Sequence, residues 1–270
     1  MTGMQGRLVE IFKWFHCFCV EHNLRYYMLG GTMLGAARHQ GFIPWDDDID
    51  VGMPRKDYEE FLELTKNKKY GNFLVEGIDT PNIDFFYGYA KVYDTKSLLV
   101  ENNRYRIKRG LFIDVFPIDG ISNEKNEVKK YVAPICAKYN LLVARTCALR
   151  KERKWFKNAF VCVSRLIPNF IIDNKKLMFS IDAMCRRRDF DSYSIVGNLY
   201  GAWGQKEIME KKFFGKPTLY VFESIQAYGV EDYDGYLTNI YGDWRKLPPK
   251  EKQVTHHDFL KCDLYKSYLE

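Results

Sequence analysis

The spacing of hydrophobic positions changes several times along the chain, and each spacing predicts a different element. In residues 5–22 apolar side chains recur at helical spacing, so we expect a helix with one buried face. The run LRYYML at 24–29 predicts a short buried strand that stops at a glycine pair. The segment TMLGAARH that follows predicts a second helix, with Thr32 as its N-cap.

Acidic and apolar residues then alternate with period two in DIDVGM, residues 48–53, which is typical of a strand. Pro54 opens the next predicted helix, RKDYEEFLELTK. The order strand, glycine turn, helix, strand, helix indicates an α/β arrangement. Further strands are predicted in four runs, at 73–78, 85–94, 97–101 and 110–120.

The pattern changes at about residue 124, and from there to 188 it is helical and basic, without glycine. No linker rich in Gly, Pro or Ser marks a boundary between independent domains. We therefore expect a core at 1–123, a helical, basic appendage of the same domain at 124–230, and a C-terminal segment at 231–270. The predicted fold class is α/β (α+β), a mixed sheet flanked by helices and carrying a helical insertion.

Charge is unevenly distributed in this 270-residue chain. The net charge of +6 is too small for a dedicated nucleic-acid binder, so no nucleic-acid partner is predicted. Residues 145–188 nevertheless contain twelve Lys or Arg against three acids, mixed with Trp, Phe, Val, Leu and Ile. This composition favours a surface helix lying on anionic lipid, although an ordinary helix with a solvated basic face has the same pattern.

The cysteines and the N-terminus give no sign of secretion. The seven cysteines contain no C-x-x-C pair, so neither a disulfide framework nor a structural zinc site is indicated. Glu10, Lys13 and His16 interrupt the apolar N-terminal stretch, which therefore does not resemble a signal peptide. No apolar run approaches the ~20 residues that span a bilayer. We expect a soluble cytoplasmic protein.

Four carboxylates, Asp46, Asp47, Asp48 and Asp50, crowd the start of the second predicted strand. Alternate residues of a strand share a face, so the side chains of Asp48 and Asp50 would lie roughly 6–7 Å apart along it. Two anions on a half-buried strand repel each other unless a cation lies between them. The pattern therefore suits a divalent cation.

Two other interpretations of the acidic run exist. A solvated acidic turn is the usual meaning of a charge run. A calcium loop would require glycine at its sixth position and glutamate at its twelfth, where this chain has Val51 and Asp57. The calcium loop is therefore disfavoured.

Asp114 is the one acid within the apolar run FIDVF. A lone buried aspartate is costly unless it is paired or bound to a metal. It either pairs with an arginine or supplies a third metal ligand beside Asp48 and Asp50. The sequence leaves both possibilities open.

Phosphate-binding features precede and follow the acidic run. Gly30, Gly31 and Thr32 lie between a strand and a helix, where exposed amides and the helix dipole favour phosphate. The candidate cations are Arg38, His39 and Lys91. Arg38 could equally face water at a helix C-terminus, and Lys91 could pair with Asp94 or another acid.

Taken together, these motifs resemble those of the nucleotidyltransferase superfamily. More narrowly, GGTMLGAARHQGFIPWDDDIDVGMPRKDY, GLFIDVFPIDG and YGDWRKLPPKEKQVTHH resemble the three signature blocks of the LicD family of phosphotransferases. The animal relatives of this family include fukutin and fukutin-related protein. The blocks occupy residues 30–58, 110–120 and 241–257, so the resemblance runs along most of the chain. It implies a nucleotidyltransferase-like catalytic core at 1–123 and a C-terminal segment that returns to the active site.

The resemblance also implies an activity. It suggests transfer of a phospho-alcohol, often phosphocholine, from a CDP-alcohol such as CDP-choline to a hydroxyl of a cell-surface glycan or its lipid-linked precursor. By position, Asp48, Asp50 and Asp114 would bind Mg²⁺ (or Mn²⁺), and Asp114 could instead take the acceptor proton. His256 and His257 would contact phosphate or shuttle a proton, unless they are structural. Contact of residues 145–188 with the inner face of the plasma membrane would fit a lipid-linked acceptor.

Two rival functions remain open on this fold. One is a nucleotidyltransferase that adds NMP to a small-molecule hydroxyl, and the other is a non-catalytic glycan- or lipid-binding scaffold. A choline group would also call for aromatic ring faces, but the sequence assigns no cage. The available aromatic residues are Trp45, Tyr87, Tyr89, Trp203, Tyr241 and Trp244.

Overall fold

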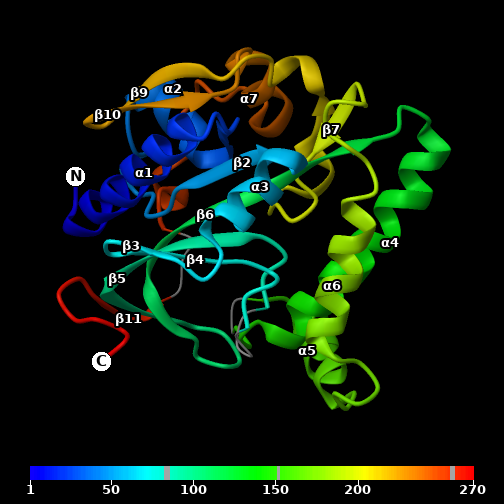
Figure 1. The fold of residues 1–270 in the computed structure, drawn as a ribbon. Helices are drawn as coiled ribbons and strands as arrows, with labels where there is room; N and C mark the ends of the chain where they lie inside the picture. The colour runs from blue at the N-terminus through cyan, green and yellow to red at the C-terminus, as the bar shows by residue number, and fades with distance from the viewer. Residues whose placement is uncertain (82–85, 151–152, 256–258) are drawn as a thin grey trace.

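The computed structural model describes residues 1–81, 86–150, 153–255 and 259–270, which form a mixed sheet flanked by helices (Figure 1). The fold class predicted from the sequence is confirmed. The helices in the described residues are α1 (Gly3–Glu21), α2 (Gly30–His39), α3 (Arg55–Thr65), α4 (Lys125–Thr146), α5 (Trp155–Leu166), α6 (Asn174–Cys185) and α7 (Tyr233–Tyr241). Three short 3₁₀ turns are η1 (Gly204–Glu207), η2 (Lys211–Phe213) and η3 (Lys250–Lys252).

The main sheet has the strand order β1-β2-β6-β5-β4-β3, with β11 beside β5, β7 beside β6 and β8 beside β7. Strand β2 pairs with β6 in parallel, whereas the other described pairs are antiparallel. Strands β9 and β10 form a separate hairpin. The strands are β1 (Tyr27–Met28), β2 (Asp50–Pro54), β3 (Lys69–Tyr70), β4 (Phe73–Glu76), β5 (Ala90–Glu101), β6 (Lys108–Ile121), β7 (Ile195–Gly197), β8 (Ile208–Glu210), β9 (Thr218–Phe222), β10 (Ile225–Gly229) and β11 (Phe259–Asp263).

Helix α1 forms much of the core, as its apolar spacing predicts. It begins with a capping box between Thr2 and Gln5, which satisfies two backbone donors of the first turn. Its buried face packs on the sheet, and Phe15 and Phe18 both contact Phe61 of α3 edge to face. One apolar layer therefore joins α1, α3 and the sheet. None of the described helices is long and apolar enough to cross a membrane.

Two local predictions are wrong in detail. Helix α2 begins at Gly30 with Leu29 as its N-cap, so Thr32 lies inside the first turn and does not cap it. The Thr32 hydroxyl instead accepts a hydrogen bond from the Asp50 amide, at 2.8 Å. Strand β2 begins at Asp50, and Asp48 lies in the connection before it. The strand starts there because its register with β6 begins at Asp50.

The appendage is only partly helical. Helices α4, α5 and α6 occupy its first part, with α4 and α6 side by side (Figure 1). The helical prediction is wrong for 195–229, which contains β7, β8, β9 and β10. Strand β7 pairs with the end of β6, so this region extends the main sheet. The division of the chain at 123/124 and 230/231 stays a prediction.

A buried arginine holds the helices of the appendage together. Arg145, at the end of α4, is completely buried and donates to oxygens from the end of α5 to the start of α6. These bonds fix the α5–α6 turn, because the carbonyls that end a helix otherwise lack partners. The acceptors are the carbonyls of Ser164, Ile167 and Ile172 and the side chains of Asn169 and Asn174.

A second buried arginine joins the appendage to the core. Arg55 of α3 makes a two-pronged contact with Asp119 of β6, with both N–O distances at 2.7 Å. Its third nitrogen lies 2.9 Å from Asp182 of α6. All three side chains are at most 4% exposed, so the charges depend on one another.

Replacing Arg55 should therefore be severely destabilising. Arg55→Leu leaves Asp119 buried without its cation and Asp182 with Arg186 as its remaining partner, and we expect a loss of about 3–5 kcal/mol in the free energy of unfolding. Chemical denaturation measures this loss. Lys56→Leu is the matched control, because Lys56 is 68% exposed in its ion pair with Asp189 and such pairs contribute less than ~1 kcal/mol. Equal losses in the two variants would contradict this account.

Candidate functional site

Three neighbouring strands place Asp50, Asp114 and Lys91 in one row. Asp50 of β2 is in register with Asp114 of β6, and Asp114 is in register with Lys91 of β5. Paired residues on adjacent strands share a face of the sheet, and their strands lie ~4.8 Å apart. The sequence separates these residues by up to 64 positions, and the register of the sheet brings them together.

Asp114 is paired, with a lysine as its partner. Lys91 Nζ lies 2.8 Å from Asp114 Oδ1 and 3.9 Å from Glu101 Oε1. The ammonium also lies over the rings of Phe112 and Tyr87, at 3.4 and 4.4 Å from their centroids. Lys91 is 2% exposed. The structure therefore shows the alternative interpretation of Lys91, a buried ion pair with an acid other than Asp94. A phosphate-binding role for Lys91 stays a prediction.

The carboxylates of the row are electrostatically strained. Burial raises the pKa of Asp50 well above its usual range, and the negative charges of Asp48, Asp114 and Asp46 raise it further. Burial also raises the pKa of Asp114, although the Lys91 ammonium acts in the opposite direction. Since these acids destabilise one another when ionised, a bound cation would stabilise the ionised state.

The remaining acids gather beside this row. Carboxylate oxygens of Asp46, Asp47 and Asp48 lie within 4.8 Å of one another. Asp48 was expected to share a strand face with Asp50, whereas it groups with its two preceding neighbours in the connection. All the acids offer oxygen ligands, the type that Mg²⁺ and Mn²⁺ prefer, so the residues present fit such an ion.

The glycine turn lies directly against these carboxylates. A Cβ at Gly31 would lie 2.7 Å from Asp46 Oδ2, so any larger residue here would displace the Asp46 carboxylate. Gly30 has a φ of +48°, in the left-handed region, and its amide donates to the Tyr236 hydroxyl of α7 at 2.9 Å. The predicted phosphate-binding turn and the acidic cluster are therefore one site.

The other predicted cations lie at the far end of α2. Arg38 is half-buried and donates to the Trp244 carbonyl at 2.8 Å, so it does not simply face water. Arg38 Nε also lies 3.5 Å from His39 Nδ1. Burial lowers the pKa of both side chains, and the Arg38 charge lowers that of His39 further. Their contact with phosphate stays a prediction, while His256 and His257 lie outside the described residues.

Glu207 is a site residue that sequence reasoning missed. This buried carboxyl of η1 accepts a hydrogen bond from the Trp203 amide at 2.9 Å. Burial raises its pKa to about 7, and its charge contributes to the raised pKa of Asp50. The local sequence GQKEIME is unremarkably polar, so no motif marks Glu207.

The elevated pKa of Glu207 predicts a pH-dependent stability. In the fold its pKa is about 7 against an ordinary 4.5, so protonated Glu207 stabilises the fold below pH 4.5 and this contribution is lost as the pH rises through 7. Glu207→Gln stays neutral throughout. In EDTA, its stability relative to wild type should rise by about 2–3 kcal/mol between pH 4.5 and 8.

Denaturant titrations at several pH values measure this difference. Glu210→Gln, at an exposed position of β8, is the control and should follow the wild-type pH profile. A difference between Glu207→Gln and wild type that does not change with pH would contradict the assignment.

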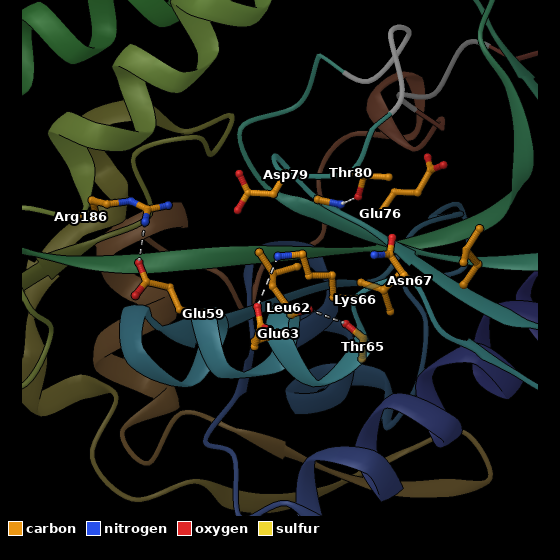
Figure 2. A pocket seen from close by; sticks show the side chains of 13 residues that line it. Glu59, Leu62, Glu63, Thr65, Lys66, Asn67, Glu76, Asp79, Thr80 and Arg186 are labelled. Atoms are coloured by element: carbon orange, nitrogen blue, oxygen red, sulfur yellow. Dashed lines mark hydrogen bonds and ion pairs between the residues drawn. The ribbon is translucent and has the colours of Figure 1, made fainter.

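A separate cavity of about 250 Å³ lies between α3 and the β4 region (Figure 2). Figure 2 shows a mixed set of charged side chains around it, including Glu59, Glu63 and Arg186. It contains none of the predicted site residues, so we do not assign the chemistry to it.

Known proteins are similar to this chain over the region that contains the row of Asp50, Asp114 and Lys91, which we call the acidic row. A family model described as LicD/FKTN/FKRP, nucleotidyltransferase domain, matches residues 23–139. The chain is 30% identical to the lipopolysaccharide cholinephosphotransferase LicD of Haemophilus influenzae over 266 residues, which are 95% of this chain and 96% of that protein. A shorter similarity, 53% over 35 residues, is to the ribitol 5-phosphate transferase FKRP of Homo sapiens and Mus musculus, covering 13% of this chain and 7% of FKRP.

Proposed function

Because this chain belongs to the LicD/FKTN/FKRP family, we propose that it is a metal-dependent phosphotransferase. It moves a phospho-alcohol, phosphocholine in the first instance, from a CDP-linked donor to a hydroxyl of a cell-surface glycan or its lipid-linked precursor. The observation that carries the proposal is the row of Asp50, Asp114 and Lys91 beneath the glycine turn. We propose phosphocholine as the transferred group because a relative that is similar along nearly the whole length of both chains is a cholinephosphotransferase.

The metal site of this proposal is built from Asp48, Asp50 and Asp114, which would hold Mg²⁺ (or Mn²⁺). Such an ion neutralises charge on the phosphate oxygens of a donor. Lys91 holds one oxygen of Asp114 and thereby fixes the orientation of that carboxylate. Gly30 and Gly31 let the donor phosphates approach the backbone, and the start of α2 favours their charge.

The transfer reaction forms one P–O bond and breaks another. The acceptor oxygen bonds to the phosphorus that carries the alcohol, and the bridging P–O bond to CMP breaks. The acceptor proton passes to the His256–His257 pair, or to Asp114 if that carboxylate does not hold the metal, and CMP leaves. Arg38 and His39 are proposed to contact the nucleotide phosphate. This chemistry requires mostly positioning and charge neutralisation, which the amides at the start of α2 and a cation held by the carboxylates would supply.

The rival functions differ in their products. A nucleotidyltransferase would release pyrophosphate from a free NTP, whereas the proposed transferase releases CMP from a CDP-alcohol. A non-catalytic scaffold would release neither. Phosphorus NMR of CDP-choline incubated with lipopolysaccharide, and of CTP incubated with small-molecule alcohols, therefore separates all three.

Loss of one carboxylate should abolish transfer. In Mg²⁺ with CDP-choline, Asp50→Asn and Asp48→Asn should each reduce CMP formation by about 10²–10³-fold or more, because a charged ligand of the metal that positions the donor is lost. Circular dichroism checks that the variants remain folded. Asp79→Asn, an exposed acid distant in sequence from the row, is the control and should keep wild-type turnover. Near wild-type turnover in Asp50→Asn, or pyrophosphate release from CTP, would refute the proposed function.

The same proposal places the protein at the inner face of the plasma membrane. Helix α5 buries only Val161 and Ser164 and exposes a broad apolar face. Trp155 is 81% exposed and Phe170, in the turn after the helix, is 88% exposed. We call the exposed apolar side chains of this region the α5 patch: Trp155, Phe156, Phe160, Val163, Leu166, Phe170 and Ile171.

Basic residues surround the α5 patch, which favours anionic lipid over a protein partner. Lys154 and Lys157 are exposed beside Trp155, and Lys176 follows the turn. Aromatic side chains with nearby lysines are the composition of interfacial helices, and each cation near an anionic surface contributes about 1 kcal/mol. Arg145 donates hydrogen bonds to backbone carbonyls of the turn after α5 and so fixes the backbone there. The apolar side chains of this turn point outward.

Vesicle binding tests the membrane contact. The protein should sediment with vesicles containing phosphatidylserine more than with phosphatidylcholine alone, and salt should weaken the preference. Trp155→Ser combined with Phe170→Ser should reduce binding at least tenfold, since two large apolar side chains no longer insert. Leu219→Ser, at an exposed position of β9, is the control. Equal binding to both vesicle types, or no effect of the double variant, would remove the membrane contact.

A further inference from the structure

A small aromatic cavity lies between α4 and the chain around the start and end of β5. Its volume is about 170 Å³, several times the ~30 Å³ that a water molecule occupies in the liquid. Five rings of the described residues line the cavity: Phe86, Tyr87, Tyr89, Tyr105 and Tyr139. The other described lining residues are apolar or uncharged, and none of them is a lysine, arginine, aspartate or glutamate.

This cavity adjoins the acidic row. Tyr87 and Tyr89 precede β5, and their ring centroids lie 4.4 and 5.6 Å from Lys91 Nζ, so both rings lie beside the lysine that pairs with Asp114. Lys91 Nζ lies 4.4 Å from the Tyr87 ring centroid and 2.8 Å from Asp114 Oδ1. Lys91, a member of the acidic row, therefore also contacts the wall of the cavity.

The charges beside the cavity favour a cation. Glu101 Oε2 accepts a hydrogen bond from the Tyr87 hydroxyl at 2.6 Å, and Glu101 Oε1 is 3.9 Å from Lys91 Nζ. Glu101 therefore places a carboxylate at the wall of the cavity, while Asp114 belongs to the proposed metal site. An aromatic lining beside a carboxylate attracts a large, weakly hydrated cation.

The lining also selects among cations. A primary ammonium needs three hydrogen-bond acceptors when it leaves water, and the acceptors that the side chains of the described lining offer are neutral ones: the tyrosine hydroxyls, Asn103 and Thr146. A quaternary ammonium has no donors to satisfy and binds through ring faces alone. We propose that this cavity binds the quaternary ammonium end of the transferred alcohol, with its phosphate at the acidic row. This inference rests on the proposed function and locates the binding site of the alcohol's head group within it.

Substitutions of Tyr139 and Tyr105 test whether the aromatic rings bind the quaternary ammonium. Tyr139 packs edge to face on Tyr200, with ring centroids 5.5 Å apart, and Tyr105 stacks on Phe86 at 4.7 Å. A ring face binds a quaternary ammonium with or without its hydroxyl. A phenylalanine should therefore preserve binding, and a leucine of similar bulk should lose it.

The experiment compares phosphocholine with 3,3-dimethylbutyl phosphate, its uncharged carbon analogue, by isothermal titration calorimetry in Mg²⁺. Wild type should prefer phosphocholine by about 5- to 30-fold. Tyr139→Phe should keep this preference, and Tyr139→Leu should reduce it to at most about twofold. Tyr105→Leu, at a more exposed position, should reduce it in part and provides the test if Tyr139→Leu does not fold.

Two results would overturn the inference: equal affinity of wild type for the two ligands, or an unchanged preference in the folded leucine variants. The result is separable from the proposed function. If CDP-choline yields no transfer but the ring-dependent preference persists, the proposed function fails and the cavity assignment stands. If transfer proceeds without the preference, the cavity assignment alone fails.

Discussion

The pairing of β2, β6 and β5 is the constraint on which the site depends. Their register aligns Asp50, Asp114 and Lys91 across three strands, so the positions of the charges follow from backbone hydrogen bonding. Two acids at the spacing of adjacent strands repel, and burial makes the repulsion stronger. One lysine offsets part of this charge. The glycine turn of α2 lies directly against the carboxylates, and in the proposed function this arrangement binds a cation and a phosphate.

The sequence predicted the parts of this site that local patterns determine. A glycine pair between strand and helix, and single acids in apolar strands, identify Gly30, Asp50 and Asp114 without a structure. It could not place Asp48, because the end of a strand depends on where its partner's hydrogen bonds stop. Glu207 was missed for a related reason. Its raised pKa comes from burial by distant parts of the chain, to which no local pattern points.

The helical appendage shows the same division between local and long-range information. Its apolar and basic periodicity predicted helices through 188, whereas the strands at 195–210 form by pairing with the end of β6. The two buried arginines were equally hidden: Arg55 joins the core to α6, and Arg145 fixes the turn after α5. In the proposed function this rigid attachment connects the acidic row to the α5 patch, so that a lipid-linked acceptor and a water-borne donor meet at one enzyme.

The central claim is that the acidic row is destabilising by itself and exists to bind a divalent cation. The thermal unfolding midpoint of wild type and Asp50→Asn at pH 7.5, with EDTA or with Mg²⁺, tests it most directly. Without metal the variant should be more stable than wild type, because one buried repelling charge is gone, and Mg²⁺ should raise the midpoint of wild type alone. A variant that is less stable without metal, yet responds to Mg²⁺ as wild type does, would contradict the claim.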